Sequence, residues 1–321
     1  MKRTLTTLLI AAVLMATLIP AAGFAGASTE NGKLVIYTCV PTTQLNMMVS
    51  MFNDQYPGIV VDVFSAKDTD LVTRVQAEAN APQGDILLGG SLASFQAIES
   101  ILRSYTSKNA NSIHAAYLTD GMAFTPVQLH VSAVIVNPAA AQKLGVTVKG
   151  WESLLDGKLS GQILYMDPTA ASADLQQATF INSLAKAVNI ASPSAPSFVL
   201  NSVDAGQSAV GIISEEKAIE RKLANAKLQI IYSQEGVAMS ASYAGMLEGA
   251  KNERSAQLFL DFILSKAYQQ AAADRLHLRS VRKDVDFGLK GVAATKDLQT
   301  ADYEILTLQL IGGADMAGKS R

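Results

Sequence analysis

From about residue 33 onward, short apolar runs rich in β-branched residues alternate with longer segments in which apolar residues recur every three or four positions. The first pattern predicts β-strands and the second predicts amphipathic helices. Strands are predicted over residues 33–38, 59–64, 85–88, 127–137, 163–166, 210–213 and 228–232, with a further extended segment over 236–243. Helices are predicted to begin near residues 42, 71, 91, 151, 172 and 215, and the longest helical pattern covers 253–273. Strands that alternate with helices in this way indicate a layered α/β fold with a mostly parallel sheet.

The first 27 residues have the layout of a secretory signal peptide. Lys2 and Arg3 are followed by an uncharged apolar stretch over residues 5–19 and then by small residues up to Ala27. Cleavage is expected after Ala27, with Ala25 as a near-equal alternative. A membrane anchor is the competing interpretation, but the apolar stretch falls short of the roughly 20 residues that a spanning helix needs. The protein is therefore expected to be exported, to the periplasm or the outer face of the cytoplasmic membrane.

Length and charge narrow the class of protein. Without residues 1–27 the chain has 294 residues, which is long for one hydrophobic core and natural for two lobes. Loss of Lys2 and Arg3 leaves 24 basic residues against 28 acidic ones, with no basic tract, so nucleic acid is not an expected partner. The single cysteine, Cys39, excludes an internal disulfide and is expected to be a buried thiol.

No familiar catalytic or metal-binding motif occurs in the sequence. GxSxG, P-loop, HExxH and CxxC motifs are all missing, and the three histidines are far apart. The sequence therefore predicts no catalytic residue, no metal site and no cofactor. Among the histidines, His130 lies in the long predicted strand over 127–137, from which it could donate a hydrogen bond to an anionic ligand.

Hydroxyl-bearing or acidic residues follow four of the predicted strands, each at the start of a helix. The four groups are Thr38 with Thr42, Gly89-Gly90-Ser91, Asp167 with Thr169 and Ser172, and Ser214-Glu215-Glu216. Ligands bind open α/β sheets at the carboxyl ends of the strands, and helix N-termini attract anions. Several such ends facing one cleft would hold an anion without an arginine, although each residue could also serve only as a helix cap.

Between residue 33 and about residue 286 the sequence resembles the extracellular solute-binding proteins of ABC importers, in the group that binds ferric iron, sugar phosphates and phosphonates. The resemblance rests on motifs that occur in the family's order along most of the chain. They are LVIYT at 34–38, YPGI at 56–59, RVQAE at 74–78, GDILLGGS at 84–91, WESLLD at 151–156, AVGI at 209–212, GAKN at 249–252 and RSVRKDV at 279–285.

This resemblance implies a two-lobed type II periplasmic-binding-protein fold. Each lobe would hold a mixed, mostly parallel sheet flanked by helices, and crossing hinge strands near residues 126–136 and 236–245 would join the lobes. Lobe 1 is expected over residues 28–130 and 240–321, and lobe 2 over residues 131–239. The resemblance also implies a permease and its ATPase subunit at the membrane as partners, and the protein itself is expected to be a monomer.

The ferric-iron members of this group carry adjacent tyrosines that bind the metal, and this chain departs from that pattern. After the predicted strand over 210–213 it has Ser214-Glu215-Glu216, and Tyr232 and Tyr243 are isolated. An acidic pair at this position resembles the members that bind sugar phosphates and phosphonates. The expected ligand is therefore a small anionic solute with a hydroxyl or amine group at its other end.

The predicted binding site divides into two ends. The anion is expected at Thr38, Thr42, Ser91 and Ser172, the opposite end of the ligand at Glu215 and Glu216, and further contacts at His130, Thr169 and Ser214. The acidic pair could instead be ordinary first-turn residues that the helix dipole favours. Arg279 is expected near the surface. Two other functions stay open at this point: a ferric-iron-binding protein of an iron importer and, in a different class, an exported hydrolase or transferase.

Overall fold

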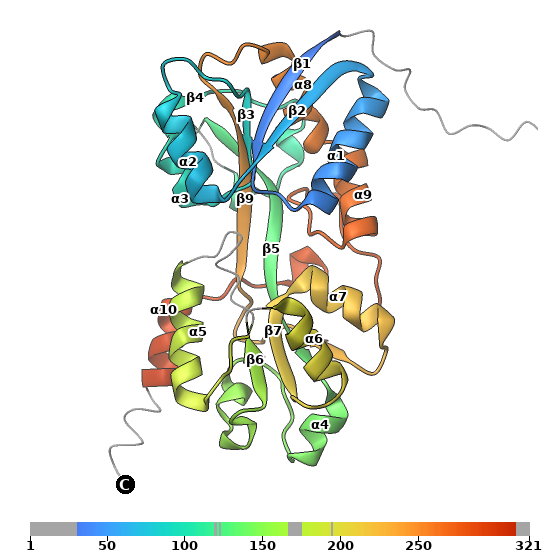
Figure 1. Cartoon of the computed structure of the whole chain (residues 1–321). Helices are drawn as coiled ribbons and strands as arrows, with labels where there is room; N and C mark the ends of the chain where they lie inside the picture. Colours follow the sequence, from blue (N-terminus) through green and yellow to red (C-terminus); the bar gives the residue numbers. More distant parts are fainter. Residues whose placement is uncertain (1–30, 119–120, 122, 166–174, 194, 313–321) are drawn as a thin grey trace, which may run out of the picture.

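The computed structural model describes residues 31–118, 121, 123–165, 175–193 and 195–312. Figure 1 shows two bodies, one above the other, joined by long strands that run between them. The upper body surrounds a hydrophobic core that includes Leu34, Phe52 and Phe259, and the lower body surrounds cores that include Trp151 and Ile213. In the described ranges no helix is both long and apolar enough to cross a membrane.

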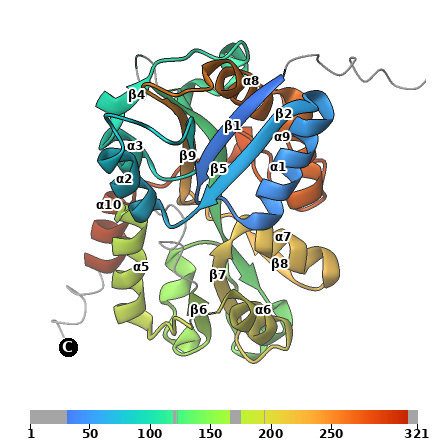
Figure 2. The same cartoon turned by 45° about the horizontal axis from the view of Figure 1, so that its top comes forward.

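The upper body begins with a unit of three parallel strands. Its elements are β1 (Asn31–Thr38), α1 (Thr42–Gln55), β2 (Gly58–Ser65), α2 (Asp68–Ala77), β3 (Ile86–Leu88), α3 (Leu92–Gln96) and β4 (Leu102–Arg103). β1 lies between β2 and β3, in a register that places Thr38 beside Ser65 and Leu88. Figure 2 shows α1 on one side of the β1–β2 pair and α2 and α3 on the other. The helix predicted from Ser91 to about Arg103 ends at Gln96, because Leu102 and Arg103 form β4, which pairs with β9 (Met239–Leu247).

Two long antiparallel strands connect the bodies. β5 (Phe124–Val136) pairs with β9 in the upper half of its length and with β7 (Val210–Ser214) and β8 (Gln229–Ile231) in the lower half. One sheet path therefore runs through both bodies in the order β2-β1-β3-β9-β5-β7-β6, in which β6 is Ile163–Tyr165. The predicted two-lobed α/β fold with crossing hinge strands is confirmed. Pairing is parallel among β1, β2 and β3 and between β6 (Ile163–Tyr165) and β7, and it is antiparallel at the crossing strands.

The lower body is built around the lower half of β5. Its helices are α4 (Pro138–Lys143), α5 (Leu175–Val188), α6 (Pro196–Asp204) and α7 (Glu215–Ala224). Trp151 is 1% exposed, packs edge-on against Phe180 of α5 and donates its indole N–H to the Gly236 carbonyl at 2.9 Å. A large ring with a satisfied N–H thus fills the core beside α5 without leaving a buried polar group unpaired.

The C-terminal part of the chain contributes to both bodies. The helix predicted over 253–273 is two helices, α8 (Glu253–Ile263) and α9 (Lys266–Leu276), because Ser265 caps α9 by accepting a hydrogen bond from the Tyr268 N–H. The chain then returns to the lower body, where Tyr303 and Leu306 of α10 (Tyr303–Leu306) pack into the core beside α5. The prediction that residues 240–321 belong to lobe 1, which is the upper body, is therefore wrong for the end of this range. The apolar side chains of α10 are buried against the lower body.

Candidate ligand-binding site

The carboxyl ends of the parallel strands point toward the junction between the two bodies. Figure 1 shows β1 and β2 ending there from above and β7 ending there from below, with the starts of α1 and α7 nearby. This is the arrangement that the sequence predicts from residues at strand ends. In open α/β sheets it is also the usual place for a ligand.

Thr38 holds the turn between β1 and α1. Its side chain is buried, and its Oγ1 accepts a hydrogen bond from the Val40 N–H at 3.0 Å. Thr42 does not serve as the cap of α1: Pro41 occupies the cap position, and Thr42 is an exposed first helical residue. Proline has no side-chain acceptor, so α1 starts without a side-chain cap, and its first turn contains no acidic residue. The first N–H groups of this 14-residue helix therefore lack a side-chain acceptor at the cap.

Ser91 caps α3, and a carboxylate already lies beside it. Ser91 Oγ accepts a hydrogen bond from the Ser94 N–H at 3.2 Å. The Ser91 N–H and the Ser94 hydroxyl both donate to Asp68 Oδ2, at 3.3 and 2.6 Å. A phosphate in this position would be repelled by Asp68, so the geometry does not favour the expected role of Ser91 at the anionic end.

A pocket of about 290 Å³ lies between the β1–α1 turn and the β2–α2 turn. It is lined by Thr38, Cys39, Val40, Ser65, Ala66, Lys67 and Asp68. Burial, together with the charge of Asp68, raises the pKa of the Cys39 thiol to about 11, so the thiol is neutral at pH 7. Asp68 Oδ1 is buried and has no hydrogen-bond donor among the described residues.

His130 lies on β5, opposite Ser240 of β9. The residue is partly exposed, but its Nε2 is buried and has no hydrogen-bond partner in the described part of the chain. Burial lowers the pKa of the imidazole from 6.5 to about 4, so the ring is neutral at pH 7. A buried nitrogen without a partner costs free energy, which a ligand atom at hydrogen-bond distance would recover.

Two helix starts lie on either side of His130 along β5. Gln44, in the first turn of α1, donates from its Nε2 to Gln128 Oε1 at 2.6 Å. Ser214, the residue before α7, is paired with Ser132. Gln128 and Ser132 are each two strand residues from His130, which corresponds to about 7 Å. The start of α1 suits an anion better than that of α7, because the first turn of α7 is acidic and that of α1 is not.

Glu215 is not available to a ligand, contrary to the prediction. It is 2% exposed, and its two carboxylate oxygens accept hydrogen bonds from Arg279 Nε and Nη2 at 2.8 and 2.6 Å. The Tyr232 hydroxyl donates a third bond to it at 2.6 Å. Arg279 is also 2% exposed, instead of lying near the surface, and donates to Thr295. Glu215 is therefore the counter-charge of a buried arginine.

The remaining predicted ligand contacts are Ser214, Glu216, Thr169 and Ser172. Ser214 precedes α7 without making a side-chain cap, and Glu216 is partly exposed in the first turn of that helix. Both lie at the junction, so they stay candidates for ligand contact. Thr169 and Ser172 lie outside the described residues.

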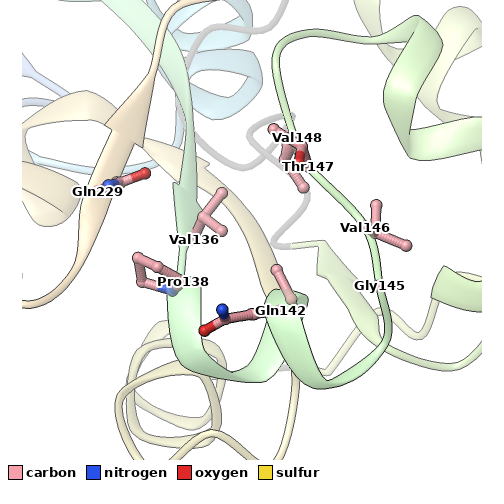
Figure 3. A pocket seen from close by; sticks show the side chains of 9 residues that line it. Val136, Pro138, Gln142, Gly145, Val146, Thr147, Val148 and Gln229 are labelled. Atoms are coloured by element: carbon pink, nitrogen blue, oxygen red, sulfur yellow. The ribbon is translucent and has the colours of Figure 1, made fainter.

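Two further pockets lie in the lower body. Figure 3 shows one of about 340 Å³, whose lining includes the apolar Val136, Pro138, Val146 and Val148 and the uncharged Gln142 and Gln229. The other, of about 450 Å³, lies beside α6 and α7, and its Lys217 and Arg221 already form ion pairs with Glu220 and Asp204. Neither offers an unpaired cation to an anionic ligand. Within the described ranges, no three His, Cys, Asp or Glu side chains gather as possible metal ligands.

Asp68 and the Gln44–Gln128 pair are candidates that the sequence analysis missed. Asp68 follows β2 in the same way as Ser91 follows β3, so its strand-end position was a usable signal. Gln44 and Gln128 are 84 positions apart, and only the fold brings them together.

Comparison with known proteins identifies the family. The model of the bacterial extracellular solute-binding protein family matches residues 47–300. An uncharacterized protein of Haemophilus influenzae is 25% identical over 281 residues, which make up 80% of this chain and 81% of the relative.

Solved structures agree with the fold. The periplasmic binding protein AfuA from Actinobacillus pleuropneumoniae, solved with exogenous fructose-6-phosphate bound, has 22% identity and a TM-score of 0.66, with 89% of this chain and 96% of that chain covered. Iron-bound HitA from Pseudomonas aeruginosa has 16% identity and a TM-score of 0.70, with 84% and 92% covered. At these identities the likeness establishes a shared two-lobed architecture.

These findings confirm the prediction of a transport binding protein over an enzyme. The family match covers both bodies and the strands between them. The chain belongs to the bacterial extracellular solute-binding protein family.

Proposed function

We propose that this protein captures a small solute with a phosphate or phosphonate group, and that the start of α1 and His130 hold this anionic group. The observation that carries the proposal is the combination of an uncapped helix start with a buried imidazole nitrogen that has no partner in the described ranges. The Gln44–Gln128 hydrogen bond ties that helix start to the strand that carries His130.

The chemistry of this site favours an anion. The first turn of a helix offers unpaired N–H groups and a partial positive charge of roughly half an elementary unit. His130 Nε2 can add a donor, and a bound anion would make protonation of the ring easier. AfuA, with fructose-6-phosphate bound, is a structural relative whose ligand has the proposed charge and size.

Ferric iron is the alternative ligand, because HitA binds iron on a similar architecture. Ferric sites in this group of proteins use tyrosine phenolates. In this chain burial raises the pKa of both Tyr232 and Tyr243, and the Tyr232 hydroxyl donates to Glu215. Phenolate formation at these two tyrosines is therefore unfavourable, which supports the anionic solute over the metal.

Capture would work by closure of the two bodies on the ligand, in a hinge motion of β5 and β9. The closed form would then dock on a permease and its ATPase subunit. We expect the protein to act as a monomer, which size-exclusion chromatography with light scattering can check.

A ligand screen tests the proposed class. Purified protein is heated with fructose 6-phosphate, a simple alkylphosphonate, inorganic phosphate, thiamine phosphate or a ferric salt. A ligand at a concentration about 100-fold above its Kd should stabilise the protein by about 2.7 kcal/mol. At least one phosphate-bearing compound should give a stabilisation of this size. If only the ferric salt raises the melting temperature, and a visible charge-transfer colour appears, the proposal is wrong and iron is the ligand.

Export is a further part of the proposal. The basic pair and apolar stretch at the start of the sequence are expected to direct secretion and to be removed after Ala27. N-terminal sequencing of the secreted protein should return Ser28 as the first residue. Recovery of Met1 from the mature form would show that this segment is retained.

A further inference from the structure

We propose that the pocket between the β1–α1 and β2–α2 turns binds the uncharged, hydroxyl-bearing end of the ligand, with Asp68 as the acceptor that recognises it. The inference rests on the proposed function, because it assigns the second half of the same binding site. It transfers the acidic end of the site from Glu215, which neutralises Arg279, to a carboxylate of the upper body.

Asp68 is held in place and still has an unused acceptor. Its Oδ2 receives hydrogen bonds from the Ser91 N–H and the Ser94 hydroxyl, which fix the orientation of the carboxylate. Its Oδ1 is buried and has no donor among the described residues. Buried polar atoms almost always have a hydrogen-bond partner, so a hydrogen-bond donor on the ligand would supply the missing partner of Asp68 Oδ1.

The backbone beside the pocket leaves room for this carboxylate. Gly90 has a φ of +89°, and a Cβ atom at this position would lie 2.5 Å from Asp68 Oδ1. Glycine is therefore needed here both for the left-handed backbone and for the close approach of Asp68. Cys39 also lies close to Gly89, where an added Cβ would be 2.8 Å from its Sγ. Both glycines thus allow two side chains of the pocket lining, Cys39 and Asp68, to approach the backbone closely.

The pocket and the proposed anion site lie close enough for one ligand. The Gly90 carbonyl accepts the Tyr243 N–H, and His130 lies opposite Ser240 on the same strand β9. Three residues along a strand correspond to about 10 Å, which is the length of a sugar phosphate. Val40 of the pocket is also only two positions from the start of α1. A phosphate at α1 would therefore leave the sugar hydroxyls directed at the pocket.

Calorimetry with two ligands separates the two ends of the site. Fructose 6-phosphate would contact both ends, whereas inorganic phosphate would contact only the anion site. Asp68→Asn should weaken fructose 6-phosphate about tenfold or more, because a charged acceptor is lost, and should change phosphate binding less than about twofold. Asp70→Asn is the matched control: Asp70 is an exposed residue of the same helix turn, and its loss should change neither affinity.

A second variant, Glu216→Gln, tests the competing assignment, in which the acidic end of the site lies on α7. If this variant loses the sugar phosphate selectively and Asp68→Asn does not, the acidic end of the site lies on α7 and the proposal is wrong. Equal losses for both ligands in Asp68→Asn would also overturn it, because they would place Asp68 at the anion.

Cys39 gives an independent measurement on the unmodified protein. It is the single cysteine of the chain and lines the pocket, so its alkylation by iodoacetamide at about pH 9 reports whether the pocket is filled. Saturating fructose 6-phosphate should slow alkylation several-fold, and saturating inorganic phosphate should not. No protection by the sugar phosphate, or protection by phosphate alone, would contradict the proposal even if Asp68→Asn does not fold.

The same labelling experiment distinguishes an error in the proposed ligand class from an error in the assignment of the pocket. If no phosphate compound binds but the ferric salt binds and protects Cys39, the proposed function is wrong and the pocket is part of a metal site. If the sugar phosphate binds without protecting Cys39, the proposed function stands and the pocket assignment is wrong.

Discussion

Replacement of Glu215 by glutamine should lower the free energy of unfolding by about 3–5 kcal/mol, the usual cost of breaking a buried ion pair. Glutamine keeps the shape of the side chain but removes the negative charge that faces the Arg279 guanidinium, which is 1% exposed. The nearest other carboxylate is Asp286, whose Oδ1 lies 3.8 Å from Arg279 Nη1 and which is partly exposed. The arginine would therefore stay charged and buried with little compensation.

The position of the ion pair explains why its loss should affect the whole protein. Arg279 accepts the Leu129 N–H with its carbonyl and donates to Thr295 and to the Ala293 carbonyl, while Glu215 begins α7. The pair thus joins a crossing strand, the lower body and the C-terminal segment. Loss of the charge would weaken all three connections together.

Urea-induced unfolding of the wild type and two variants tests this prediction. Glu216→Gln is the matched control, because it makes the same chemical change one residue away at a partly exposed position, and it should change stability by less than about 0.5 kcal/mol. Glu215→Gln should unfold at clearly lower urea even without ligand. Similar midpoints for the two variants would show that Glu215 is not needed to neutralise Arg279.

The stability of the protein should also decrease as the pH is lowered from 6.5 toward 4, because of His130. The unfolded imidazole has a pKa of 6.5 and binds a proton in this range, whereas the buried folded imidazole has a pKa of about 4 and stays neutral. The unfolded state therefore binds more protons, and unfolding becomes more favourable as the pH falls. The pKa difference corresponds to an upper limit of about 3.4 kcal/mol, and the partial exposure of the residue reduces the expected loss to about 2–3 kcal/mol.

His130→Gln isolates this contribution. Carboxylates that titrate in the same range are common to both proteins, so the difference between the two stability curves reports His130 alone. The stability of the wild type minus that of the variant should decrease as the pH falls below 6.5, since only the wild type loses the stability linked to His130. Saturating inorganic phosphate should reduce the loss in the wild type, because a bound anion favours the imidazolium. Parallel curves would indicate that the imidazole reaches solvent.

Sequence patterns predicted the elements of the fold and missed several boundaries. The strands at β1, β2, β5, β6 and β7 follow from runs of β-branched residues, and the crossing strands lie where the resemblance placed them. The single helix predicted over 253–273 is divided at Ser265, which caps α9. The spacing of apolar residues gives no information on a serine cap, so the division was not predicted. The end of the chain was assigned to the wrong body, since Tyr303 finds its apolar contacts only in the folded lower core.

The candidate site was predicted from the positions of residues at strand ends. In the structure these strand ends lie at the junction between the two bodies, because the carboxyl ends of parallel strands meet at one edge whatever side chains they carry. It could not assign roles there. Glu215 and Glu216 are adjacent and chemically alike in the sequence, yet one neutralises an arginine 64 positions away and the other is partly exposed.

The sequence by itself determined the class of this protein. Its apolar periodicity, family motifs and strand-end residues depend on neighbours along the chain, and they specify a two-lobed extracellular solute-binding protein. Only the tertiary structure decided which polar groups are free to bind. Within the part of the chain that the structure describes, Asp68 Oδ1 and His130 Nε2 have no hydrogen-bond partner, while both Glu215 oxygens accept hydrogen bonds. Whether a polar atom has a partner depends on residues far away in the chain, and this is the quantity that determines where a ligand can bind.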